Sequence, residues 1–407
     1  MSSRTSSRLM LLVTVLVVAA NLRPAITVVG PLIETVGADT GLTPTALGLL
    51  GSIPIIAFAA VSPFVHLLGV RFGLERTIFV SLLVLTAGTL LRSASGLLPG
   101  GDSEAAGEGW LAVLPLYAGT ALLSAAIGVG NVLVPAVVKR DFPDRVALMT
   151  GVYTAALVAA AASFSAAAVP LAEWLGWEGA FGSAAALALA AAAVWALRGR
   201  PCDDGADEVP LSSTPAPSSL LRQPLAWQVT LFFGLQSTLF YVLLTWFPAV
   251  QTSHGIGEAQ AGYWLGLFQA IGVVASLVIG QVLQRSRDQR IVAAAVAGFM
   301  IIALAGMILA PALMPLWALS GGISSGSSLM LGLTFISLRA SSPTQVGRLS
   351  GMAQGFGYLL AAAGPVLAGM LYEAVGSWTP VLLCALAVAV AQLVMGLLAG
   401  RSVQLRS

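Results

Sequence analysis

Long apolar segments recur along the whole chain and are separated by short polar stretches. Each has about 20 residues or more, the length at which a helix crosses the hydrocarbon core of a bilayer. The segments lack the strict alternation that marks the strands of a membrane barrel. The pattern therefore predicts an all-α membrane protein with twelve transmembrane helices, at 9–36, 46–69, 76–98, 111–138, 146–170, 176–198, 226–250, 260–284, 290–310, 313–338, 347–372 and 378–400.

Composition and charge support this reading and orient the chain. Of 407 residues, 57% are hydrophobic and 9% charged, against roughly a quarter charged in soluble domains. With a cytoplasmic N-terminus, all Lys and Arg residues except Arg23 and Arg92 fall on the cytoplasmic side, as the positive-inside rule requires. We therefore expect both termini in the cytoplasm. The net charge of +2 is a topology signal, and no nucleic-acid partner is expected.

The first apolar segment has an alternative interpretation as a cleavable signal peptide. Arg4 and Arg8 precede it, and Val18-Ala19-Ala20 resembles a cleavage site. Cleavage there would leave eleven spans and spoil the sorting of basic residues, so we favour a retained first span.

A polar linker and an internal repeat divide the chain in two. Residues 199–224 are rich in Asp, Ser and Pro and separate six spans from six. At an offset of 200, Lys139 matches Arg339 and Gly151 matches Gly351; at an offset of 214, Arg71 matches Arg285. We expect pseudo-symmetric six-helix bundles at 1–198 and 225–407. Parallel repeats around a central site are a plan of secondary transporters.

Three local motifs narrow the family. The segments NLRPAIT at 21–27, GVGNVLVPAVVKRDFPDRV at 128–146 and LSGMAQGFGYLL at 349–360 resemble the cyanate and nitroimidazole transporter family of the major facilitator superfamily. The resemblance covers essentially the whole chain. It implies the inner membrane of a bacterium, alternating access around a cavity lined by the first, fourth, seventh and tenth spans, and a substrate such as cyanate or a nitroimidazole.

One loop departs from the general superfamily pattern. Between the second and third spans the superfamily usually has an Asp among basic residues, whereas residues 69–76 read GVRFGLER. The usual gating ion pair therefore cannot be carried over from the resemblance.

Arg23 is the main candidate for substrate binding. A charge at the centre of a span costs about 2.5–3.5 kcal/mol on insertion scales, so Arg23 should face the bundle interior. Thr27, Gly30 and Glu34 follow it at helical spacing and predict one polar stripe, and Pro24 should bend the helix. No Asp or Glu lies deep in a predicted span. We expect Arg23 to bind an anionic or strongly polar substrate; the alternative is a structural role in capping carbonyl groups.

Other polar and aromatic residues of the spans could complete the site. Each also has a structural interpretation, because small and polar residues hold membrane helices together. Glu34 is the coupling candidate, for a proton or a counter-ion. We expect no catalytic residue, metal or cofactor. The further candidates for substrate binding are Asn131, Tyr153, Gln236, Tyr241, Phe268, Gln269, Gln354 and Tyr358.

These observations favour a monomeric secondary transporter for a small anionic or strongly polar organic solute. A drug exporter for a neutral or cationic compound is the alternative. A membrane enzyme would need a cluster of nucleophile, base or metal ligands, which the sequence lacks. A channel would be expected to repeat its polar ring by symmetry, whereas the polar positions differ between the two halves.

Overall fold

The computed structural model describes residues 2–97, 109–198, 218–285 and 288–405, and within these ranges all regular structure is helical. Most of the predicted linker, residues 199–217, lies outside them. The helices are α1 (Ser2–Ala20), α2 (Pro24–Thr27), η1 (Gly30–Leu32), α3 (Ile33–Thr40), α4 (Pro44–Phe72), α5 (Leu74–Ser93), η2 (Ala94–Leu97), α6 (Gly109–Asp141), η3 (Pro143–Arg145), α7 (Val146–Leu197), α8 (Ser218–Leu221), α9 (Pro224–Thr252), α10 (Glu258–Arg285), α11 (Arg290–Leu309), η4 (Pro311–Leu313), α12 (Met314–Arg339), α13 (Pro343–Val375) and α14 (Trp378–Ala399).

The predicted all-α membrane architecture is confirmed. The described residues contain 11 helical runs long and apolar enough to cross a membrane. One of them, α7, has 52 residues, about 78 Å at 1.5 Å per residue, which is far longer than one crossing needs. It breaks at Gly176, where φ is 73° and ψ is 166°, a conformation that glycine adopts without steric cost. The break turns α7 into two spans and gives the expected twelve.

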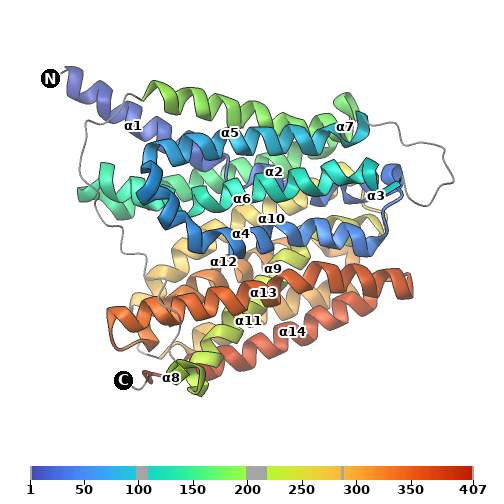
Figure 1. The fold of residues 1–407 in the computed structure, drawn as a ribbon. Coiled ribbons are helices and arrows are strands. Elements are labelled where there is room, and N and C mark those ends of the chain that lie inside the picture. Colours follow the sequence, from blue (N-terminus) through green and yellow to red (C-terminus); the bar gives the residue numbers. More distant parts are fainter. Residues whose placement is uncertain (1, 98–108, 199–217, 286–287, 406–407) are drawn as a thin grey trace.

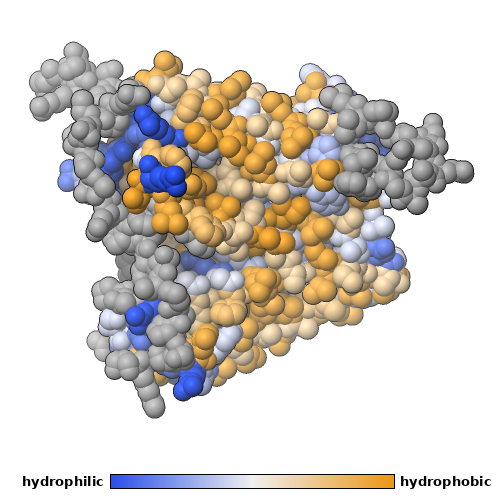
Figure 2. Space-filling view, in the orientation of Figure 1, coloured by the Kyte–Doolittle hydropathy of each residue, from blue (hydrophilic) through white to orange (hydrophobic). Residues whose placement is uncertain are grey.

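The two halves of the chain form adjoining groups of helices. Most of helices α1 to α7 lie in the upper part of Figure 1 and α11, α13 and α14 lie in the lower part, while α4 and α10 overlap at mid-height; both termini lie at the same end of the molecule. Apolar residues cover the middle of the face in Figure 2, and hydrophilic residues gather toward its ends. This belt is the surface that a bilayer would cover.

Buried side chains form three apolar clusters that follow this division. One cluster draws only on the first half, from Val15 to Trp195, and another only on the second, from Leu220 to Leu405. The third joins the halves and includes Leu32, Leu50 and Phe268. The halves therefore have cores of their own and share one more.

An ion-pair network lies near the ends of α5, α6 and α7. Arg140 donates to Glu75 at 2.5 Å and to Asp141 at 2.8 Å, and Arg198 donates to Asp141. The loop between the second and third spans thus carries an ion pair although it lacks the superfamily's Asp. The sequence expectation missed it because Glu75, in the first turn of α5, supplies the carboxylate.

Candidate functional site

The first membrane span is interrupted at Arg23. Helix α1 ends at Ala20, and α2 begins at Pro24 in its first helical position. Proline disfavours helical geometry in the residue before it, and Arg23 has φ −134° and ψ −36°. Asn21 stabilises the break, because its side-chain amide donates to the carbonyl oxygens of Val17 at 2.8 Å and Leu187 at 3.3 Å. The sequence predicts only a bend at Pro24. The structure shows instead that the span is unwound at Arg23.

The break sends the Arg23 side chain into a cavity between the halves. The cavity has a volume of about 290 Å³ and is lined by the first span together with α6, α7, α9, α10, α12 and α13. The expected first, fourth, seventh and tenth spans all contribute, and the fifth, eighth and eleventh complete the walls. Most of the predicted site residues line it: Arg23, Asn131, Tyr153, Gln236, Tyr241, Phe268, Gln269 and Tyr358.

The Arg23 guanidinium lacks a neutralising partner in the described part of the chain. It makes no ion pair or hydrogen bond there, and its Cζ lies 5.6 Å from the ring centroid of Phe240. Tyr241 and Tyr358 line the same cavity. A partly exposed cation over an aromatic face retains several free N–H donors, so an anion entering the cavity would find them available.

Aromatic rings form one wall beside this cation. Phe240 stacks on Phe268 with centroids 6.3 Å apart and an interplanar angle of 20°, and it meets Tyr241 edge-on at 5.1 Å. Sequence reasoning missed Phe240, because an aromatic residue in an apolar span reads as core. Its position three residues after Ser237, the repeat counterpart of Arg23, and next to Tyr241 was the signal that could have revealed it.

Two amide side chains of the second half carry hydrogen bonds at the cavity wall. Gln236 donates to Ser237 Oγ at 2.6 Å. Gln269 donates to Ser165 Oγ at 2.9 Å, and Ser165 donates to the carbonyl oxygen of Thr27 at 3.1 Å. The second chain links a cavity residue of α10, through α7, to the interrupted first span.

Two of the candidate residues lie outside the cavity, and the predicted polar stripe does not form. Gln354 does not line the cavity; its amide donates to Ser350 Oγ at 2.8 Å. Glu34, in the first turn of α3, accepts a hydrogen bond from Thr252 Oγ1 at 2.6 Å and is also remote from the cavity. The prediction of one continuous polar stripe from Arg23 to Glu34 is wrong, because the span is interrupted before Pro24 and again before η1.

The halves close against each other at the end away from the termini. Thr45 donates to Glu373 at 2.5 Å there, and Thr252 donates to Glu34 at 2.6 Å. Close backbone contacts support the closure: a Cβ atom on Gly262 would lie 2.8 Å from the carbonyl oxygen of Ser165, and one on Gly266 would lie 2.9 Å from that of Ala162. Both are shorter than real Cβ contacts, so these glycines permit the approach of α10 to α7.

Comparison with known families agrees with this geometry. The model of the Major Facilitator Superfamily matches residues 15–340. The chain belongs to this superfamily. It is 40% identical over 403 residues to the 2-nitroimidazole transporter of Escherichia coli (strain K12), covering 98% of both chains. It is 27% identical over 378 residues to the cyanate transport protein CynX of the same organism, covering 91% of each.

A solved transporter structure shares the fold. A bacterial homolog of the human lysosomal transporter Spinster, in an inward-facing and occupied conformation, matches with a TM-score of 0.75 and 13% identity, over 97% of this chain and 96% of that one. The protein is thus a multi-pass membrane transporter of the Major Facilitator Superfamily, with the predicted fold, and not an enzyme.

Proposed function

We propose that this protein is a secondary active transporter that moves a small anionic or strongly polar organic solute, cyanate-like or nitroimidazole-like, by alternating access. The observation that carries the proposal is the Arg23 guanidinium, which faces the cavity between the halves without a carboxylate partner among the described residues. Relatives named for 2-nitroimidazole and cyanate transport support the same solute class.

The cavity's other walls support a small and flat solute. Its volume of about 290 Å³ is at the lower limit of drug-sized pockets, which begin near 300 Å³. The planar guanidinium can hold two acceptor atoms at once, and the faces of Phe240 and Phe268 suit a planar ring. In this binding mode Gln236, Gln269 and Asn131 would supply the remaining polar contacts.

The proposal includes how the two halves move and on which side of the membrane the cavity opens. The halves, residues 1–198 and 225–407, would rock about the cavity, joined by the linker at 199–224. Contacts at the end away from the termini support a state that is closed on that side. With both termini in the cytoplasm, as the basic residues indicate, this is an inward-facing state of a monomer in the bacterial inner membrane.

Substitution of Arg23 tests the proposal. A hydrogen bond to a charged group contributes about 1.5–3 kcal/mol, so Arg23→Ala should weaken binding of cyanate or 2-nitroimidazole by about tenfold to a hundredfold. Arg23→Lys keeps the charge but loses the planar fork and should recover part of the affinity. Thermal-shift titrations of the purified variants, followed by uptake into proteoliposomes, measure both effects.

The same titrations separate this proposal from its alternatives. If Arg23 has a structural role, Arg23→Ala would lower the apo melting temperature and leave the affinity of the folded fraction nearly unchanged. A drug exporter for neutral or cationic compounds would instead gain affinity for its substrates once the positive charge is removed. Either result would contradict the proposed binding role.

A further inference from the structure

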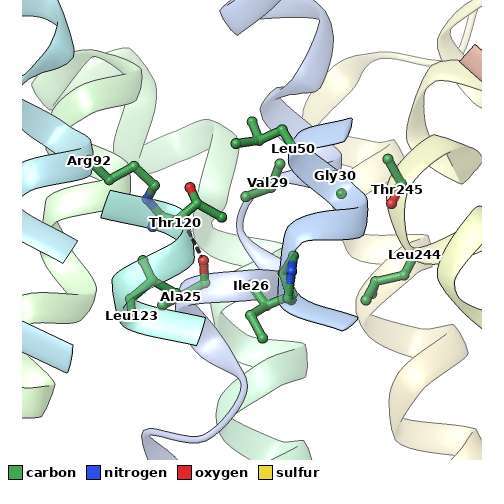
Figure 3. A pocket seen from close by; sticks show the side chains of 12 residues that line it. Ala25, Ile26, Val29, Gly30, Leu50, Arg92, Thr120, Leu123, Leu244 and Thr245 are labelled. Carbon is green, nitrogen blue, oxygen red and sulfur yellow. Dashed lines mark hydrogen bonds between the residues drawn. The ribbon is translucent and has the colours of Figure 1, made fainter. Parts of the chain in front are cut away.

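A second arginine lies inside the spans, behind the interruption. Arg92 of α5 has no exposed surface. It lines a small cavity of about 10 Å³ together with Ala25 and Gly30 of the first span and Thr120 of α6. Figure 3 shows its guanidinium directed toward the backbone of Ala25. No Asp or Glu in the described ranges forms an ion pair with it. Burying an unpaired charge is costly, so the position of Arg92 needs an explanation.

Its contacts are carbonyl oxygens and a ring. Nη1 donates to the carbonyl oxygen of Ala25 at 2.6 Å, and Nη2 donates to that of Phe181 at 3.4 Å. The guanidinium carbon lies 4.3 Å from the centroid of the Phe181 ring. Nε is buried and has no hydrogen-bond partner among the residues that the structure describes. The planar guanidinium group of Arg92 thus connects the interrupted first span to α7 through Nη1 and Nη2.

The carbonyl oxygen of Ala25 lacks its helical donor because of the second break in the first span, before η1. In a continuous α-helix it would accept from the amide of Val29. Here that amide donates to Ile26 at 3.3 Å, because the chain tightens before η1. A buried carbonyl without a partner is destabilising, and Arg92 supplies the donor. Ala25 is two residues from Arg23, so the bond fixes the backbone that carries the Arg23 side chain.

We propose that Arg92 is a positioning residue for substrate binding: by holding the Ala25 carbonyl it keeps the first span unwound in the geometry that directs Arg23 into the cavity. The inference rests on the proposed role of Arg23. A charged donor makes a stronger bond to a carbonyl than a neutral one, and the fork geometry lets one side chain hold two carbonyls. A neutral side chain of similar volume would fill the space without fixing the span.

A double-mutant cycle between Arg92 and Arg23 tests the inference. Arg92→Met should weaken binding of cyanate and 2-nitroimidazole by about tenfold in the wild-type background, as is typical for coupled residues. It should have little further effect in the Arg23→Ala background, because the residue it positions is gone. Arg92→Lys keeps one charged donor and should recover part of the affinity; it also serves if Arg92→Met does not fold. The apparent KM should change more than the maximal rate.

Thr89→Val is the matched control. Thr89 is fully buried one turn earlier in α5, and its hydroxyl donates to Leu85 at 2.7 Å within the same helix. It should lower the melting temperature without changing affinity. Equal losses from Arg92→Met with and without Arg23, or no loss of affinity at all, would overturn the inference while leaving the proposed function intact. Wild-type affinity in Arg23→Ala alone would overturn both.

Discussion

Two guanidinium groups approach the interruption of the first span from different cavities. Arg23 lies in the large cavity between the halves and donates to none of the described residues through its guanidinium, whereas Arg92 is fully buried and donates to backbone carbonyls. The sequence left two interpretations of Arg23 open, substrate binding and carbonyl capping. In the structure it is Arg92 that caps carbonyl groups, whereas Arg23 lines the cavity. The capping geometry observed at Arg92 supports the proposal that Arg23 serves the substrate.

Phe240 offers a residue-scale test that depends on the chemistry of the solute. Phe240→Leu removes the aromatic face beside Arg23 while keeping an apolar side chain. Aromatic pairs contribute about 0.5–1.5 kcal/mol beyond their buried area, so the affinity for 2-nitroimidazole should fall by roughly threefold to tenfold. The affinity for cyanate, which has no ring, should change much less. Ligand titrations by thermal shift compare the two solutes directly.

Phe247→Leu is the control for this comparison. Phe247 belongs to the same aromatic cluster and is buried; its ring centroid lies 6.2 Å from that of Phe268. It is not among the residues that line the cavity. It should reduce stability and leave both affinities unchanged. An equal loss of cyanate and nitroimidazole affinity in Phe240→Leu would contradict a stacking role.

At the residue scale, the sequence could predict which side chains are unusual but not how they pair. Arg23, Gln236 and Gln269 stand out because polar groups in a span are costly, and all three line the cavity. The sequence distinguishes Arg92 only as a basic residue that does not fall on the cytoplasmic side, because nothing in the sequence reveals that the Ala25 carbonyl needs a donor. That need arises from backbone geometry.

At the scale of elements, glycines control how closely α10 approaches α7. A methyl group on Gly266 would meet the backbone oxygen of Ala162 at 2.9 Å, and backbone cannot move aside as a flexible side chain can. Overpacking of this kind costs about 1–3 kcal/mol. Gly266→Ala should therefore shift the population away from the state closed at this end by roughly fivefold to a hundredfold.

The shift can be measured as the labelling rate of a cysteine introduced at Thr252, whose contact with Glu34 is then lost equally in every variant compared. Gly298→Ala in α11 is the control, because a methyl group there would meet nothing within 4 Å. An unchanged labelling rate in Gly266→Ala, equal to that of the control, would show that the glycine contact does not hold this end closed.

The apolar segments predict that the membrane-spanning helices exist, but they do not predict where a helix is interrupted. Hydropathy predicted all twelve spans, because a bilayer demands long apolar runs whatever their tertiary contacts. It could not locate the unwound turn at 21–23, since Pro24 is compatible with a bend as well as with a new helix start. Tertiary partners decide between these outcomes: Asn21, Arg92 and Ser165 supply the donors that an unwound span requires.

At the scale of the whole molecule, a cross-link can test the alternating movement of the halves. Thr45 of α4 and Glu373 of α13 are in hydrogen-bond contact, at 2.5 Å. In a variant lacking native cysteines, Thr45→Cys with Glu373→Cys should react with a short bifunctional thiol reagent. The cross-linked protein should still bind solute offered from the side of the termini, but uptake into proteoliposomes should stop.

The single-cysteine variants serve as controls, since each reacts with the reagent but cannot lock the halves together. Transport at the normal rate by the cross-linked protein would contradict a movement that separates the halves at this end. Loss of binding together with transport would contradict the expected access from the side of the termini.

The cavity's walls are chemically unequal: the first half contributes the cation of Arg23, and the second half contributes the ring face of Phe240. In the proposed binding mode, a solute that is both flat and negatively polarised touches both halves at once and lowers the free energy of the compact, occluded intermediate. A ring without acceptor atoms would occupy the cavity without engaging the cation, and so would act as an inhibitor instead of cargo. Selectivity would then be exerted at the crossing step as well as at binding.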